Sequence, residues 1–147
     1  MRAPLACLLV LAALPVSAET APLPTVTVDL TFSDQALAAL ADTDGVVVRA
    51  YWMGEPAPGA TLTDPELGTV FLMTEDLQFA APPARVILGA SLASAPLTEV
   101  IEPKLNLNVG SAGWGGETNL LDCGFLDDVI SVLAATPQTV HCKLLGE

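Results

Sequence analysis

Residues 25–32 read TVTVDLTF, and residues 46–53 read VVVRAYWM. In the first stretch apolar and polar side chains alternate, which is the pattern of a strand with one buried face. The second stretch is apolar almost throughout, as is typical of a strand in the interior of a sheet. Together the two stretches predict a β-rich fold in which residues 46–53 form the central strand.

Two short helices are expected beside these strands. Ser33 is placed to cap a helix over residues 34–41, and the acid at Asp34 suits its first turn. Residues 126–135 form the second expected helix, because their apolar side chains recur at helical spacing and Pro137 follows. The other connections are predicted as turns and loops, at Asp44-Gly45, at the Pro- and Gly-rich residues 54–59, at a single helical turn between Pro96 and Pro103, and at the Gly-rich residues 111–118.

Further strands are expected at residues 69–73, 76–79, 84–89, 104–109 and 138–144. Short strands separated by turn residues, without regular alternation with helices, predict a mainly β fold. We expect a small antiparallel β-sandwich, or a barrel-like sandwich, with one or two short helices. The length of 147 residues suits one domain, which we place at residues 25–147 after an extended lead-in at residues 19–24.

The N-terminus has the parts of a secretory signal. Arg2 is followed by an apolar run over residues 5–14 and by the small residues Val16-Ser17-Ala18, so cleavage is expected after Ala18. The apolar run is too short to span a bilayer, and no membrane insertion is expected after cleavage. A lipid anchor at Cys7 is the weaker alternative, because the apolar run follows this cysteine instead of preceding it. Low Lys and high Ala content favour a bacterial protein exported to the periplasm or the medium.

The charge of the chain limits its partners. It has 17 acids, five Lys and Arg residues and a formal net charge of −12, and loss of the signal with Arg2 makes the charge −13. Nucleic acid is excluded, because a phosphate-binding surface needs clustered Lys and Arg, and an anionic membrane surface is disfavoured. The acidity is compatible with an envelope protein that has a basic surface. The alternative is an acidic surface that is only solvated, which the even spread of the acids favours.

The cysteines predict one covalent link. Loss of Cys7 leaves Cys123 and Cys142, and an even pair in an exported protein predicts a disulfide. Alternation places Leu121 and Phe125 on the same face as Cys123, and we expect both thiols to point inward. Closing this loop is expected to stabilise the fold by about 3 kcal/mol. The wide spacing favours a structural link over a redox-active pair, which would be close in sequence as C-x-x-C.

No complete catalytic motif is present. His141 is the only histidine, and alternation places it on an outward face. A hydrolase would need a nucleophile and an orienting acid beside it. Ser91 lies in the sequence GASLA, which lacks the second glycine of a nucleophile elbow. We predict no catalytic residue and no cofactor, and keep a small hydrolase based on His141 and nearby carboxylates as an alternative function.

The sequence indicates a metal site no more strongly than a catalytic site. Asp42 and Asp44, followed by Gly45, match part of a calcium-binding EF-hand loop. The first and twelfth positions of that loop would be Leu40 and Tyr51, where carboxylates are required. The simpler interpretation is a helix end followed by a tight turn. Asp42 and Asp44 are therefore the calcium candidates of a possible calcium-dependent binding module, and no metal site is predicted.

The aromatic residues indicate a contact surface. Tyr51, Trp52 and Met53 precede the loop at residues 54–59, and Trp114 lies in another loop. Tyr, Trp and Met are enriched in binding patches. Alternation favours a core position for Trp52. Because enzyme motifs are absent, the sequence favours an exported protein with a non-enzymatic binding or accessory role in the cell envelope.

Overall fold

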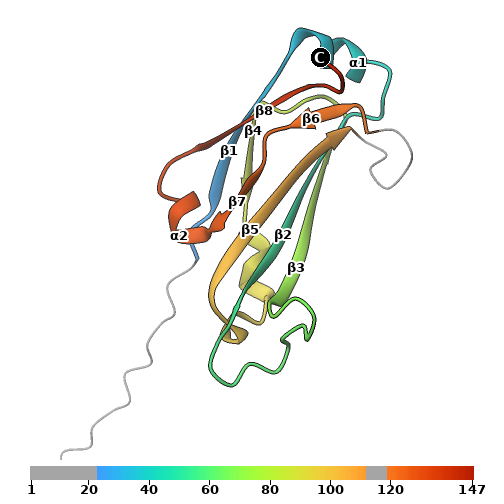
Figure 1. Ribbon diagram of the computed structural model, residues 1–147. Coiled ribbons are helices and arrows are strands. Elements are labelled where there is room, and N and C mark those ends of the chain that lie inside the picture. Colours follow the sequence, from blue (N-terminus) through green and yellow to red (C-terminus); the bar gives the residue numbers. More distant parts are fainter. Residues whose placement is uncertain (1–22, 112–118) are drawn as a thin grey trace, which may run out of the picture.

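The computed structural model describes residues 23–111 and 119–147. The expected signal at residues 1–18, most of the lead-in and Trp114 lie outside the described residues. The described chain forms eight strands, two α-helices and two 3-10 turns (Figure 1). In chain order they are β1 (Val26–Phe32), α1 (Asp34–Leu40), β2 (Val46–Pro56), β3 (Val70–Phe79), β4 (Arg85–Leu88), η1 (Ala90–Ser94), η2 (Leu97–Glu99), β5 (Val100–Ser111), β6 (Leu121–Cys123), β7 (Leu126–Val129), α2 (Ile130–Leu133) and β8 (Gln138–Leu144).

The strands form two sheets of four that pack as a sandwich, which confirms the predicted fold class. Sheet I has the order β4-β1-β8-β6, and sheet II has the order β3-β2-β5-β7. Neighbouring strands are antiparallel except for β1 and β8, which are parallel. As predicted, β2 is an interior strand, with β3 on one side and β5 on the other.

The core lies between the sheets and is built around Trp52, which is fully buried. Its indole N–H donates to Glu75 Oε2 at 3.2 Å, and the same oxygen accepts the N–H of Gly89 at 2.9 Å. Glu75 lies opposite Ala50, on the inward face of the edge strand β3. An inward-pointing charge on an edge strand discourages pairing with another chain, so this carboxylate both holds the core and protects the edge.

Helix α1 begins and ends as its sequence predicts. The hydroxyl of Ser33 accepts the N–H of Ala36 at 3.1 Å, and Ala36 and Leu40 are the buried residues of the helix. The following turn needs a glycine, because Gly45 has φ +106° and a Cβ there would lie 1.9 Å from the carbonyl oxygen of Phe79. The chain therefore enters β2 through one tight turn.

Three strands are longer than the sequence predicts. The expected loop at residues 54–59 begins too early, because β2 continues to Pro56. Gly54 is required in this strand, because β5 approaches it so closely that a Cβ would lie 2.6 Å from the carbonyl oxygen of Glu102. The two strands expected at residues 69–73 and 76–79 are one strand, β3, with a register shift opposite Trp52 and Met53.

Strand β5 also extends past the point where a proline was expected to stop a helical turn. Pro103 is inside the strand, opposite Gly54. On the other side β7 pairs only with residues 104–107, so at Pro103 the strand has β2 as its single neighbour, and a proline is tolerated where a strand is unpaired on one side.

The second predicted helix is mostly wrong. Residues 126–129 form β7 against β5, and only Ile130–Leu133 is helical. The apolar spacing is correct for Ile130 and Leu133, which are buried. Residues 126–129 instead complete the edge of sheet II, which helical spacing alone does not reveal.

The predicted disulfide is present and joins two strands of sheet I. Cys123 of β6 lies opposite Cys142 of β8, with an S–S distance of 2.05 Å. Leu121 and Cys142 are buried, but Phe125 is 71% exposed and does not share their inward face. The reason is that the chain leaves sheet I after Cys123 and joins sheet II at Leu126, so the alternation is broken at Gly124.

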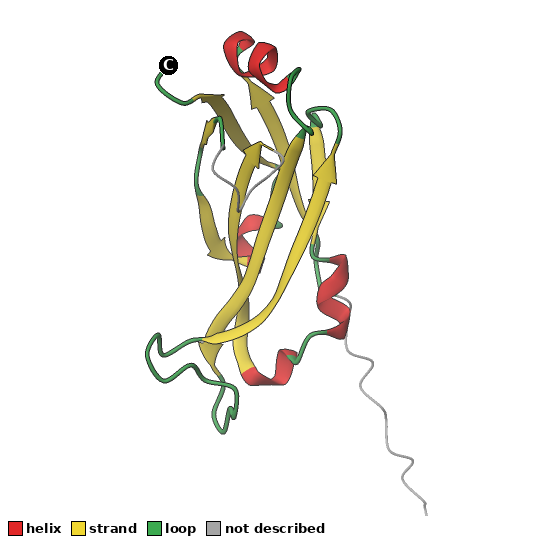
Figure 2. Cartoon of the chain, turned by 90° about the vertical axis from the view of Figure 1, so that its right-hand side faces the viewer, coloured by secondary structure: helices red, strands yellow, loops and turns green. Residues whose placement is uncertain are grey.

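The connections lie at opposite ends of the sandwich. Helix α1 is at one end, and the loop over residues 57–69 is at the other (Figures 1 and 2). This loop is held by Glu99, whose Oε2 accepts the N–H groups of Thr61 at 2.5 Å and Leu62 at 3.0 Å. Among the residues described, no helix is long and apolar enough to cross a lipid bilayer.

Candidate partner-contact surface

On the outer face of sheet II, side chains that lie opposite one another on neighbouring strands form rows across the sheet. Because Trp52 points into the core, its neighbours Tyr51 and Met53 point outward. Tyr51 lies opposite Thr74 of β3 and Asn106 of β5. These residues form a flat row of aromatic and polar side chains across the middle of the face.

An apolar row lies next to it, toward the loop at residues 57–69. Met53 lies opposite Phe71 on one side and Lys104 on the other, and Lys104 lies opposite Val129. Phe71 is 52% exposed although it is a large apolar residue. Thr63 forms an isolated antiparallel bridge with Val70, which places Leu62 beside Phe71.

A depression of about 330 Å³ adjoins this row. Its apolar part is made by Ile101, which is 67% exposed, and by Val129. We call Leu62, Phe71, Met53, Val129 and Ile101 together the apolar band. Exposed apolar patches of this kind mark interaction sites. The remaining lining of the depression is charged and comes from Glu55, Glu102, Lys104 and Asp128.

The bases of this face are neutralised within the face. Arg49 donates from Nε and Nη2 to the two carboxylate oxygens of Asp76, both at 2.8 Å. This bond lowers the pKa of the Asp76 carboxyl. The pKa of the Arg49 guanidinium is raised, mainly by its bond to Asp76 and to a smaller extent by Tyr51. Lys104 Nζ lies 3.0 Å from Asp127 Oδ1. The face therefore presents no unpaired base among its described residues.

The same holds for the rest of the protein after residue 18. Arg85 pairs with Asp29 at 2.6 Å, and Lys143 pairs with Asp122 at 3.3 Å. With Arg49 and Lys104, this accounts for all four Lys and Arg residues in that part of the sequence. Each of these four basic side chains therefore has an acidic partner on the same protein.

The four residues of the contact surface predicted from the sequence do not lie together on one face. Tyr51 and Met53 are half-buried and lie on the outer face of sheet II. Trp52 is 0% exposed, so it is a core residue and not part of a contact surface in this fold. The position of Trp114 lies outside the described residues.

His141 is exposed on the outer face of sheet I, as alternation predicts. Its Nδ1 lies 2.9 Å from the hydroxyl of Thr31, the residue opposite it in β1. The hydroxyl of Ser33 donates to Glu147 Oε2 at 2.6 Å, and His141 lies close enough to act electrostatically on this carboxylate. That bond lowers the pKa of Glu147. The hydrogen bonds among the described residues therefore do not link a serine, the histidine and an acid into a catalytic triad.

The calcium candidates lie in a turn. Asp42 and Asp44 are exposed, and the turn is held by Thr43, whose hydroxyl donates to the carbonyl oxygen of Leu40 at 2.9 Å and accepts the N–H of Gly45 at 3.1 Å. In residues 23–111 and 119–147, no three His, Cys, Asp or Glu side chains are grouped to hold a metal ion.

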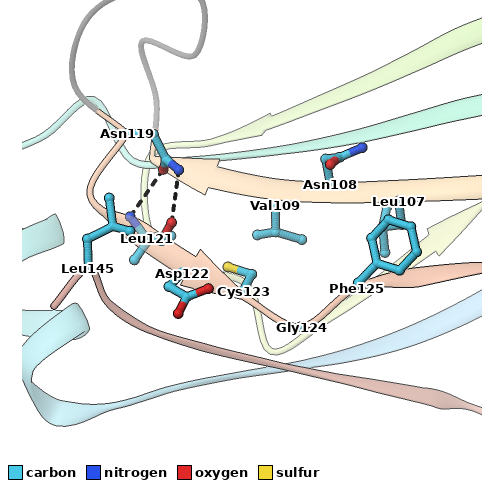
Figure 3. A pocket seen from close by; sticks show the side chains of 10 residues that line it. All are labelled: Leu107, Asn108, Val109, Asn119, Leu121, Asp122, Cys123, Gly124, Phe125 and Leu145. Carbon is cyan, nitrogen blue, oxygen red and sulfur yellow. Dashed lines mark hydrogen bonds between the residues drawn. The ribbon is translucent and has the colours of Figure 1, made fainter. Parts of the chain in front are cut away.

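A second pocket, of about 210 Å³, lies between β5 and β6 where the chain changes sheets. Asn119 and Phe125 are at its opposite ends, with Val109 and Cys123 between them (Figure 3). The amide of Asn119 is occupied, because its Oδ1 accepts the N–H of Leu121 at 3.1 Å and its Nδ2 donates to the carbonyl oxygen of Leu121 at 2.8 Å. The amide of Asn119 thus bonds the chain itself.

Sequence reasoning missed most of the apolar band. Phe71 was within an expected strand, but the register shift in β3 that exposes it depends on its partner β2. Ile101 was assigned to a turn. No local signal indicates either residue, because Phe71 lies between Val70 and Leu72 and Ile101 follows Val100.

Comparisons of the chain with protein-family models, with curated proteins and with solved structures find no match, so the functional assignment rests on the described surface.

Proposed function

We propose that this protein is an exported, non-enzymatic binding or accessory protein of the cell envelope, and that it binds a partner protein through the outer face of sheet II. The observation that carries the proposal is the apolar band, in which Phe71 and Ile101 are more than half exposed on one side of one sheet. Interface centres are enriched in such apolar and aromatic residues and depleted of unpaired charge.

Export is supported by the disulfide between Cys123 and Cys142, because disulfides persist in oxidising compartments. N-terminal sequencing of the protein recovered from the periplasm or the medium tests this half of the proposal. We expect the mature chain to begin at Glu19. Recovery of only the full-length chain from the cytoplasm would contradict it.

Site-specific photo-crosslinking tests the contact surface. A photoreactive phenylalanine analogue replaces Phe71 in one variant and Ile87 in the other. Ile87 is a matched control, because it is 58% exposed and lies opposite Thr27 on the outer face of sheet I. We expect one envelope protein to be captured reproducibly from position 71 and not from position 87. Equal capture from both positions, or none from position 71, would reject the surface.

A further inference from the structure

The depression beside Ile101 combines an apolar floor with a surplus of negative charge. Three of its six lining residues are acids, namely Glu55, Glu102 and Asp128. Lys104 is the one base that lines it, and its ammonium lies against Asp127, which is outside the lining. The three carboxylates of the depression therefore have no base of this protein to neutralise them among the described residues.

Two of these carboxylates are held in place by the backbone. Glu102 Oε1 accepts the N–H of Ser131 at 3.2 Å, and Asp128 Oδ1 accepts the N–H of Val129 at 2.8 Å. These bonds hold one carboxylate on β5 and one on β7, two of the strands that border the depression. A ligand that enters between them meets negative charge that is already positioned.

The side chains that fit such a depression are Lys and Arg. Their aliphatic stems bury against apolar surface, here Ile101 and Val129, while the charged head remains near carboxylates at the rim. Met53 and Phe71, which adjoin the depression, would then contact an apolar residue next to this Lys or Arg in the partner. A second copy of this chain does not meet these requirements, because each copy has all four of its mature Lys and Arg residues in ion pairs and a net charge of −12 before signal loss.

We propose that the partner of this face presents a basic, amphipathic protein segment, with a Lys or Arg side chain in the depression at Ile101 and apolar side chains on the rest of the apolar band. This inference rests on the proposed function and names the chemistry of the partner. The attraction between the segment and the three carboxylates is screened by salt, so binding weakens as ionic strength rises.

Two synthetic peptides of equal length test it. Both contain the same Leu and Phe residues, and the remaining positions are Lys in one peptide and Glu in the other. NMR titration of the ¹⁵N-labelled protein with the Lys peptide is expected to shift the amide signals of Phe71, Ile101 and Val129, and the Glu peptide is expected to shift none of them. Shifts confined to α1, or equal shifts with both peptides, would overturn the proposal.

Variants with matched charge separate a site from general attraction to an acidic protein. Glu55→Gln, Glu102→Gln and Asp128→Asn together are expected to weaken binding of the Lys peptide by about tenfold, as three partly screened ion pairs would. Both amide replacements at Glu102 and Asp128 keep an oxygen acceptor for the backbone. The control combines Asp34→Asn, Asp42→Asn and Asp44→Asn at the opposite end, and should weaken binding by no more than about twofold. Equal weakening by the two sets would reject the depression as the site.

Ile101→Ser is the second variant, for the case that the triple replacement does not fold. Ile101 is exposed, so its loss leaves the core intact and the charge unchanged. We expect it to weaken binding of the Lys peptide by several-fold, and unchanged binding would contradict the proposal. If the peptide does not bind but position 71 still captures one envelope protein, the basic partner is rejected and the contact surface stands. If neither occurs, both are rejected.

Discussion

The outer faces of the two sheets have the same alternation of inward and outward side chains, but they differ in which outward side chains meet across the strands. On sheet I, three pairs of polar residues that lie directly opposite one another are bonded: Asp29 with Arg85, Thr31 with His141, and Asp122 with Lys143. On sheet II, one such pair is present, Arg49 with Asp76, and the next row instead sets Met53 opposite Phe71.

The difference shows what alternation alone leaves open. Alternation states which side chains point outward, and the strand register states which of them meet. Outward residues that are satisfied by a cross-strand neighbour stabilise the sheet. An apolar pair that remains exposed, as at Met53 and Phe71, gains little from its neighbour and is available to a partner.

The largest effect we predict separates the two faces of β2 at adjacent positions. Trp52→Ala is expected to lower the free energy of unfolding by about 3–5 kcal/mol, because it leaves a cavity and removes the indole donor to Glu75. Tyr51→Ala, on the outer face, should cost about 1 kcal/mol or less. Urea denaturation of both variants measures the difference. Similar losses would mean that the outer face of sheet II is as important for stability as the core.

The second prediction concerns sheet I, which alone has a covalent link. Replacing Cys123 and Cys142 together with Ala opens a loop with a sequence separation of 19 residues. We expect a loss of about 3 kcal/mol in the free energy of unfolding, mainly through the entropy of the unfolded chain. Amide hydrogen exchange should increase most in β6 and β8. An equal increase in β2 and β3 would show that the two sheets open as one unit.

Much of the sheet framework follows from local sequence. The strand at Val26–Phe32, the Ser33 cap, the glycine turn before Val46 and the strand at Gln138–Leu144 are all predicted, because alternation and turn chemistry are local signals. The disulfide follows from the number and spacing of the cysteines.

The remaining elements depend on distant partners. Pro103 is tolerated in β5 because β7 ends before it, and Gly54 is required in β2 because β5 approaches it closely. Leu126 joins a strand because the edge of β5 is open to it. No window of sequence around these residues contains that information.

The candidate site was predictable to a similar degree. Tyr51 and Met53 were identified from their residue types, and alternation favoured the core position that Trp52 has. Phe71 and Ile101 were missed, because their exposure results from irregular pairing at the end of sheet II, with a shift in β3 and another where β2 meets the start of β5. The acidic lining was invisible for a related reason, since Glu55, Glu102 and Asp128 come from three different strands.

The smallest effect we predict is a change with pH at one end of the molecule, where the loop is held by Glu99, compared with the other end, where Glu147 bonds Ser33 and Leu144. Glu99 accepts the N–H groups of Thr61 and Leu62, and these bonds lower its pKa below the ordinary value of 4.5. A carboxyl whose pKa is lower in the folded state stabilises the fold above its unfolded pKa, and this contribution is lost as the pH falls through the folded pKa. The loop at residues 57–69, which bears Leu62 of the apolar band, should therefore loosen at acidic pH below about 4.5.

Glu99→Gln tests this directly, because glutamine keeps an oxygen acceptor but has no charge to lose. The amide signals of Thr61 and Leu62 are expected to change with pH in the native protein and to be nearly independent of pH in the variant. At the other end Glu147, whose pKa is lowered by Ser33 and Leu144, should respond to acid equally in both proteins. If the Thr61 and Leu62 signals of the variant still follow pH as in the native protein, the loop is held by groups other than Glu99. Acid would then loosen the loop through another group, and Glu99 would not be the carboxylate that makes this end of the molecule sensitive to pH.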